Sequence, residues 1–325
     1  MNISEITKKY RNKDQCYKYL ESIRWHGRPS CPYCNENKRI TKRQKSYRHH
    51  CQKCNKDFSV LVGTIFENTR LPLPKWFLLI GLILNAKSGI SAKELQRNVG
   101  IGYPTAWFCA MRVRCAMIDT DNELQNLIEM DESYVGGKPR KKNKKVAANI
   151  PILSTVETKN KRGRGTNKTP VVGIVERNGK IVLKVVEKLT SRNLVKMLKN
   201  NVNTENSLVM TDEYRPYRKF EDIVEHLSID HSKGEFKRGI VHLNTIEGFW
   251  TIVKNSIRGS YKSLSKKYLP FYLVQAQYIY NHRNYRGDLF RKFIKQAVSV
   301  DKCMICYQPK GDVKKIVYKP KKKRS

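Results

Sequence analysis

The sequence predicts an α/β protein in which a mixed sheet follows a small cysteine-bearing module and a helical segment. Three observations predict this: two close cysteine pairs near the N-terminus, apolar segments with helix-start and turn residues over 71–115, and short apolar runs separated by turns from 127 onward. The chain has 325 residues, of which 39% are hydrophobic, enough for two or three folded units. We expect the units to be 1–70, 71–125 and 126–290, followed by a basic tail at 291–325.

The charge balance is strongly basic. The chain has 65 Lys+Arg against 28 Asp+Glu, a formal net charge of +37. So many charges of one sign repel one another, so we expect a polyanionic partner. Nucleic acid is the first candidate, and an anionic membrane surface is the second. The most apolar run, 76–86, is shorter than the roughly 20 residues that span a bilayer, and the N-terminus does not resemble a signal peptide. We therefore expect an intracellular protein that is not inserted in a membrane.

The cysteine spacing in the first unit predicts a metal site. Cys31, Cys34, Cys51 and Cys54 form a C-x2-C-x16-C-x2-C pattern, and two such knuckles complete a tetrahedral zinc shell. The intervening segment 38–50 has the alternation of a hairpin, so the pattern describes a zinc ribbon. With no open ligand position the zinc would be structural. Four reduced cysteines without metal remain the alternative, and three nearby histidines are possible substitute ligands: His26, His49 and His50.

The second unit has the pattern of a helix-turn-helix. An apolar helix is expected at 71–89, a second begins at Ser91 with Glu94 three residues later, and a third begins near Pro104 after a glycine-containing turn. On the third helix, three side chains are expected to face DNA: Thr105, Arg112 and Arg114. Trp107, Ala110, Met111 and Cys115 would face the core. A purely structural three-helix bundle is the alternative.

From residue 127 the pattern changes to strands separated by turns and helices. Strands are expected at 127–135, 169–177, 180–189, 207–214 and 222–229, and helices at 191–202 and 245–259. This order matches a ribonuclease-H-like core, in which three antiparallel strands join two parallel ones. The insertion 138–169 has 11 basic residues and one acidic residue. It is either solvated surface or a flexible loop that holds phosphate backbone beside the site.

Three of the chain's few carboxylates are the expected catalytic groups. Asp131 lies in the first strand, Asp212 ends the fourth, and Glu247 begins the last helix. In the expected core the first and fourth strands are adjacent, so the three acids would share one pocket, which two hard divalent cations would neutralise. Such a metal pair activates the attacking oxygen and stabilises the leaving oxygen in phosphoryl transfer. Glu132 and Glu213 would point to the opposite faces of their strands and play an indirect role at most.

The segments 242–261, 130–138, 163–177 and 211–217 resemble the DDE-type transposases of bacterial insertion sequences. The resemblance is to the zinc-ribbon-bearing group related to the eukaryotic Merlin elements, and it covers nearly the whole chain. It implies a ribonuclease-H-like catalytic domain that uses Mg²⁺ (or Mn²⁺) to cut and join element ends, with Asp131, Asp212 and Glu247 as catalytic residues. Some relatives have Asn at the third position, so support from Asn244 or His242 stays open. Lys254 matches a basic residue placed against DNA, whereas Trp250 is expected in the core.

The expected partners are the element's terminal inverted repeats and target DNA, bound by at least a homodimer. The expected location is the cytoplasm or nucleoid of a bacterium, or the nucleus of a eukaryote. Two alternatives share the same core: a domesticated DNA-binding regulator and a structure-selective nuclease. The apolar helix at 266–286 is expected to pack on the catalytic core. Cys303 and Cys306 are expected to be incidental thiols.

Overall fold

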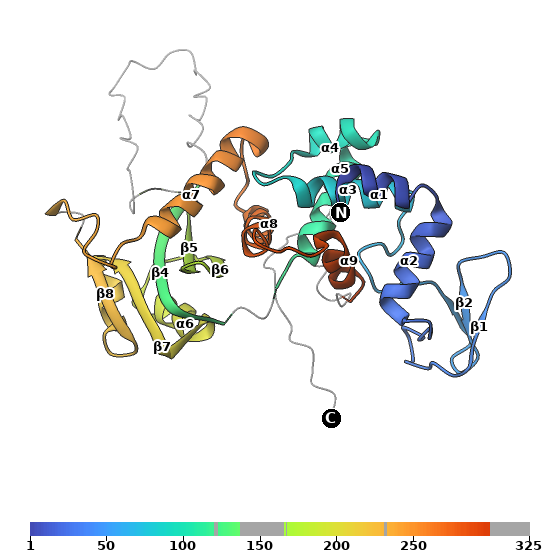
Figure 1. Cartoon of the computed structure of the whole chain (residues 1–325), viewed down its shortest axis with the longest axis horizontal. Coiled ribbons are helices and arrows are strands. Elements are labelled where there is room, and N and C mark those ends of the chain that lie inside the picture. Colours follow the sequence, from blue (N-terminus) through green and yellow to red (C-terminus); the bar gives the residue numbers. More distant parts are fainter. Residues whose placement is uncertain (120–122, 137–165, 167, 231–232, 300–325) are drawn as a thin grey trace, which may run out of the picture. The chain divides into compact units, whose positions relative to one another are not determined.

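The computed structural model describes residues 1–119, 123–136, 166, 168–230 and 233–299 (Figure 1). The chain forms two compact units. The first comprises residues 1–121, 259–261 and 270–325, and the second comprises 122–258 and 262–269. Most of the basic insertion 138–169, the tail from 300 and the Cys303/Cys306 pair lie outside the described residues.

The first unit begins with two capped helices and a small sheet. Helices α1 (Ile3–Lys9) and α2 (Lys13–Trp25) each start with a capping box, in which an Asn side chain accepts the N3 amide and the N3 side chain reaches back. Strands β1 (Ile40–Lys42), β2 (His49–Cys51) and β3 (Lys56–Phe58) form an antiparallel sheet in that order. The hairpin predicted between the two cysteine pairs is therefore confirmed.

The described part of this unit also contains α3 (Leu73–Asn85), α4 (Ala92–Val99), α5 (Tyr103–Ala116), α8 (Leu269–Asn281) from Pro270 onward, and α9 (Leu289–Ser299). Ser91 caps α4 by accepting a hydrogen bond from the Glu94 amide at 3.1 Å, and Gly100 ends it with a φ of 62°. The predicted helix, turn and helix are thus present.

One hydrophobic core joins the ribbon, the N-terminal helices and the C-terminal helices. Phe58 from β3, Phe77 from α3 and Phe293 from α9 all belong to it. The modules expected at 1–70 and 71–125 therefore share a core. From Pro270 onward, the helix expected at 266–286 belongs to the first unit, where α8 contributes Tyr278 to the core.

The second unit is built on a five-stranded mixed sheet. Its strands are β4 (Leu124–Val135), β5 (Thr169–Glu176), β6 (Ile181–Val185), β7 (Val202–Asp212) and β8 (Glu225–Ile229), arranged in the order β6-β5-β4-β7-β8. The pairs β6/β5 and β5/β4 are antiparallel, whereas β4/β7 and β7/β8 are parallel. This is the ribonuclease-H-like arrangement that the order of elements predicted. The β5–β6 turn contains Asn178 with a φ of 61°, as expected for Asn-Gly.

Helices cover both faces of this sheet. On one face, α6 (Ser191–Asn201) and the 3₁₀ helix η2 (Arg215–Phe220) enclose a core of apolar side chains from β4, β5 and β7. On the other face, α7 (Asn244–Ser256) packs against β4 and β5 (Figure 1). Gly173 of β5 permits this close approach, because a Cβ there would lie 2.9 Å from the Trp250 ring and 3.0 Å from Ile246. The helix that carries Glu247 is thereby held against the strand that carries Asp131.

A short π-helical turn, η4 (Ile257–Tyr261), follows α7. No helix in the described part of the chain is both long and apolar enough to cross a membrane.

Candidate active site

The four predicted cysteines lie together in the ribbon. Their sulfur atoms are all within 4.8 Å of one another, with Cys31 Sγ 3.6 Å from Cys54 Sγ and Cys34 Sγ 3.5 Å from Cys51 Sγ. Sulfurs about 2.3 Å from a tetrahedral zinc ion are separated by roughly 3.8 Å, so the cluster fits zinc. Burial opposes ionisation of Cys51, but hydrogen bonds from the Cys54 amide and from Cys34 lower its pKa to about 7.

Tight turns shape the two cysteine knuckles. Asn35 and Asn55 follow the two pairs with φ values of 58° and 52°, a conformation that Asn tolerates better than most residues. His49 and His50 are engaged elsewhere, with Glu21 and Asp57 respectively. The four thiolates therefore complete the shell without an open position.

Asp131 and Asp212 meet at one edge of the second sheet. The parallel pairing of β4 with β7 aligns Glu129 with Met210, so Asp131 and Asp212, two residues further along, share an edge and a face. One oxygen of each, together with one oxygen of Glu132, lies within 4.8 Å of the others. The structure thus brings together two of the three predicted acids and adds Glu132.

The contacts of these carboxylates fix their directions. Asp131 Oδ2 accepts a hydrogen bond from Trp250 Nε1 at 3.1 Å, and Asp212 Oδ1 accepts one from the Tyr214 amide at 3.1 Å. Glu132 Oε2 accepts one from the Tyr217 hydroxyl at 2.9 Å, on the opposite face of the sheet. Glu132 therefore leaves β4 on the expected face, but its long side chain reaches the edge where the other two acids lie.

Electrostatics at this edge favour a bound cation. Burial, followed by the charge of Glu132 and that of Asp212, raises the pKa of Asp131 to about 7. Burial and the same acids raise the pKa of Tyr217 well above its ordinary value. A close set of carboxylate oxygens of this kind fits hard divalent ions such as Mg²⁺.

Glu247 lies in the first turn of α7 with its side chain exposed, and it is not part of the acidic group at the strand edge. The helix itself is tied to that group, because Trp250, one turn later, donates to Asp131. Trp250 is 2% exposed, as the prediction of a core position requires. Lys254 is exposed two turns after Glu247 on the same side of the helix.

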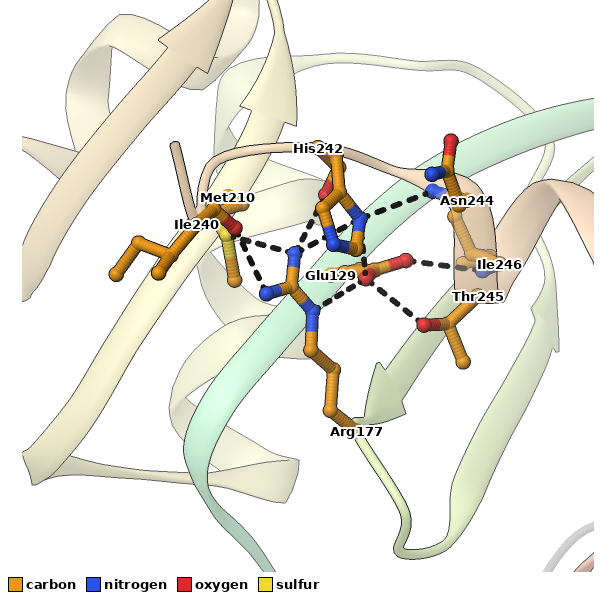
Figure 2. A network of polar contacts seen from close by, with 8 residues as sticks. All are labelled: Glu129, Arg177, Met210, Ile240, His242, Asn244, Thr245 and Ile246. Carbon is orange, nitrogen blue, oxygen red and sulfur yellow. Dashed lines mark hydrogen bonds and ion pairs between the residues drawn. The ribbon is translucent and has the colours of Figure 1, made fainter. Parts of the chain in front are cut away.

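The two supporting candidates, His242 and Asn244, belong to a different polar network (Figure 2). His242 Nδ1 lies 3.0 Å from Arg177 Nη2 and 3.5 Å from the buried carboxylate of Glu129, and it accepts the Asn244 amide at 3.4 Å. Burial and the charge of Arg177 lower the pKa of His242, in keeping with a neutral ring. The network was missed from sequence, although a glutamate within an apolar strand indicates a buried partner.

The arginines predicted to face DNA are buried in the first unit. Arg112 donates to the Glu67 carbonyl at 3.0 Å and the Thr64 carbonyl at 3.3 Å. Arg114 is 2% exposed, donates to Gln275 Oε1 at 2.8 Å and lies 4.0 Å from the Tyr272 ring centre. The expectation that they contact DNA is therefore wrong. The reason is that α5 packs on several helices at once, so only its first turn, including Thr105, is exposed.

Comparison with known proteins gives two family matches. Residues 123–281 match the ISXO2-like transposase domain, and residues 11–57 match the transposase zinc-ribbon domain. The chain is also 27% identical over 288 residues to a Halobacterium salinarum protein described as an uncharacterized protein in transposable element ISH50. That alignment covers 86% of this chain and 92% of the relative.

Among solved structures, the chain is similar to a pre-cleavage Mos1 transpososome, with 11% identity, coverage of 67% of this chain and 76% of that one, and a TM-score of 0.25. It is also similar to the mariner Mos1 paired end complex with Mg, with 12% identity, coverage of 71% and 80%, and a TM-score of 0.27. The strand order β6-β5-β4-β7-β8 identifies the ribonuclease-H-like fold. The two family matches include the cysteine cluster and the acidic edge, and the chain belongs to the DDE transposases that combine an ISXO2-like catalytic domain with a transposase zinc ribbon.

Proposed function

We propose that this transposase cuts and joins DNA at the ends of its insertion sequence with two Mg²⁺ or Mn²⁺ ions held by Asp131, Asp212 and Glu247. The observation that carries this proposal is the meeting of Asp131 and Asp212 at the ends of two adjacent parallel strands. Divalent ions there would activate water or a 3′-hydroxyl and stabilise the leaving oxygen. The protein would supply the ligands: Asp131, Asp212 and Glu247 would hold the ions in place.

The remaining parts would serve DNA binding. The ribbon within 1–70 and the exposed first turn of α5 within 71–125 would recognise the terminal inverted repeats, and Lys254 would contact phosphates near the catalytic domain at 126–290. Cutting two ends in concert favours a homodimer or larger assembly on DNA. The protein would act where that DNA lies, in the nucleoid of a prokaryote or the nucleus of a eukaryote.

The test uses duplexes that carry the element's own terminal repeats, with Mg²⁺, the full-length protein and its Asp131→Asn and Asp212→Asn variants. Each substitution removes a charged metal ligand, so we expect cleavage to fall by about 10³-fold or more while DNA binding persists. Asp222→Asn is the matched control, because Asp222 is an exposed acid after η2 whose partner is Lys219. Cleavage at the wild-type rate by both variants would refute the proposed site.

Pre-cut ends supplied with Mg²⁺ and a target duplex test the joining step. Joined product is expected from the wild type and from Asp222→Asn only. Cleavage without any joining would instead identify a nuclease on the same core, and DNA binding without either reaction would identify a regulator.

A further inference from the structure

A second carboxylate on the same face of β4 as Asp131 is fully buried and contacts the first turn of α7. Glu129 Oε1 accepts hydrogen bonds from Arg177 Nε at 2.6 Å and from Thr245 Oγ1 at 2.9 Å (Figure 2). Its Oε2 accepts the backbone amide of Ile246 at 3.0 Å. The side chain is 0% exposed. Both oxygens are therefore engaged, and Glu129 is not available as a metal ligand.

Arg177 connects this carboxylate to the segment that leads into α7. Its Nη1 donates to the Ile240 carbonyl at 2.7 Å, and its Nη2 donates to the His242 carbonyl at 2.9 Å (Figure 2). Glu129 and Arg177 therefore hold the chain on both sides of the helix start. We call Glu129, Arg177, His242 and Thr245 the Glu129 cluster.

The Glu129 cluster and Asp131 together hold α7 at two points. Glu129 binds the Ile246 amide, and Asp131 binds the Trp250 indole. Residues i and i+2 on one face of a strand are about 6.7 Å apart, and four helical residues advance about 6.0 Å, so the two spacings match. Glu247 lies between the two points, and both the position and the rotation of its turn are therefore constrained.

Burying an ion pair is a costly way to hold a helix, since an apolar contact of the same volume stabilises equally well. Compared with an apolar contact, the ion pair adds a directional constraint on the helix. An anion at a helix N-terminus must meet specific amides, and a guanidinium must meet specific carbonyls. The Glu129 cluster therefore selects one placement of α7, which an apolar contact would not.

We propose that the Glu129 cluster is a positioning device that sets the first turn of α7 so that the Glu247 carboxylate reaches the metal ions at the Asp131–Asp212 edge. The inference rests on the proposed function. Glu129 acts through Glu247 and touches neither DNA nor metal.

Mn²⁺ binding to the full-length, zinc-loaded protein, followed by electron paramagnetic resonance, tests the proposal without using activity. Glu129→Gln keeps the shape but removes the charge that Arg177 requires. Thr245→Val is nearly isosteric and removes one donor only. Glu225→Gln is the matched control, because Glu225 is an exposed acid on β8 of the same unit.

Glu129→Gln is expected to weaken Mn²⁺ binding by about 10-fold, the usual effect of removing a partner that orients a metal ligand, and Thr245→Val by less. In a Glu247→Gln background neither substitution should weaken it further, because the group they position is already lost. With DNA, both should lower kcat while leaving the Kd for DNA unchanged. A stability loss alone would produce none of this pattern.

Wild-type Mn²⁺ affinity in both variants would overturn the proposal, and so would an equal loss with or without Glu247. If circular dichroism shows that Glu129→Gln is unfolded, Thr245→Val decides between these outcomes. The proposed function fails separately, through Asp131→Asn and Asp212→Asn. If these two abolish cleavage while Glu247→Gln leaves Mn²⁺ binding intact, the transposase chemistry stands and the positioning role is refuted.

Discussion

The two candidate metal sites of this chain differ in how completely one short segment can build them. The ribbon gathers four cysteines within 24 residues of sequence, and each pair lies on a tight turn. The acidic edge combines Asp131 of β4 with Asp212 of β7, 81 positions later in the sequence, and its expected third ligand lies on a helix. The cysteine site is closed, and it forms together with the ribbon that surrounds it. The acidic site is open, and it lies on a sheet whose folding does not require a metal ion. Metal should therefore be needed for folding in the ribbon and for reactivity at the acidic edge.

Removing zinc should have the largest effect, and only in the first unit. Cys34→Ser with Cys51→Ser takes one thiolate from each knuckle, and zinc supplies about 10 kcal/mol or more of folding free energy in small domains of this type. We expect the ribbon to become protease-sensitive while the β4–β8 sheet keeps its hydrogen-exchange protection. Mass spectrometry of the cleaved fragments and zinc analysis would measure both.

Cys109→Ala is the matched control, because Cys109 is a buried thiol outside the cluster. It should retain a full complement of zinc. An intact ribbon in the zinc-free double variant would show that its apolar core suffices for folding, and the contrast between the two sites would disappear.

The next largest effect should distinguish Glu247 from Glu132 as the third acid. Glu247→Gln is expected to reduce cleavage by about 10³-fold, as loss of a metal ligand, whereas Glu132→Gln should cost about 10-fold, as loss of an orienting neighbour. Single-turnover cleavage at saturating DNA measures both. Tyr217→Phe removes the hydrogen bond to Glu132 and should match the smaller effect. The reverse ranking would assign the third ligand to β4 and place all three metal ligands on strands of the sheet.

Much of this fold was predictable because its signals are local. Alternating apolar runs and the Asn178 turn indicated the strands, and adjacent parallel strands must end at the same edge, which brought Asp131 to Asp212. The errors came from interactions distant in sequence. Arg114 is satisfied by Gln275, 161 residues away, so its charge wrongly indicated exposure. Arg177 and Glu129 are 48 residues apart, and their pairing emerges only once the strands are placed.

The smallest predicted effect concerns the metal-free acidic edge and its dependence on pH. The pKa of Asp131 is raised to about 7 by burial and by its acidic neighbours, whereas an unfolded Asp has a pKa of about 3.9. The folded state therefore binds the extra proton between these values, so stability falls as pH rises from about 4 to about 7 and stays lowered above it. Asp131→Asn should remove this penalty, since an amide oxygen can still accept from Trp250.

Without divalent ions, urea unfolding near pH 8 should therefore show Asp131→Asn more stable than the wild type by about 1–2 kcal/mol, with no difference near pH 4. The full shift corresponds to about 4 kcal/mol, but Asp131 is only partly buried and solvent screens its neighbours. Adding Mg²⁺ should reverse the order at pH 8, because the ion stabilises the charged edge of the wild type alone. If the wild type is instead more stable than Asp131→Asn near pH 8 without Mg²⁺, the acids at this edge do not repel one another. The fold itself would then balance the charges at this edge without a bound metal ion.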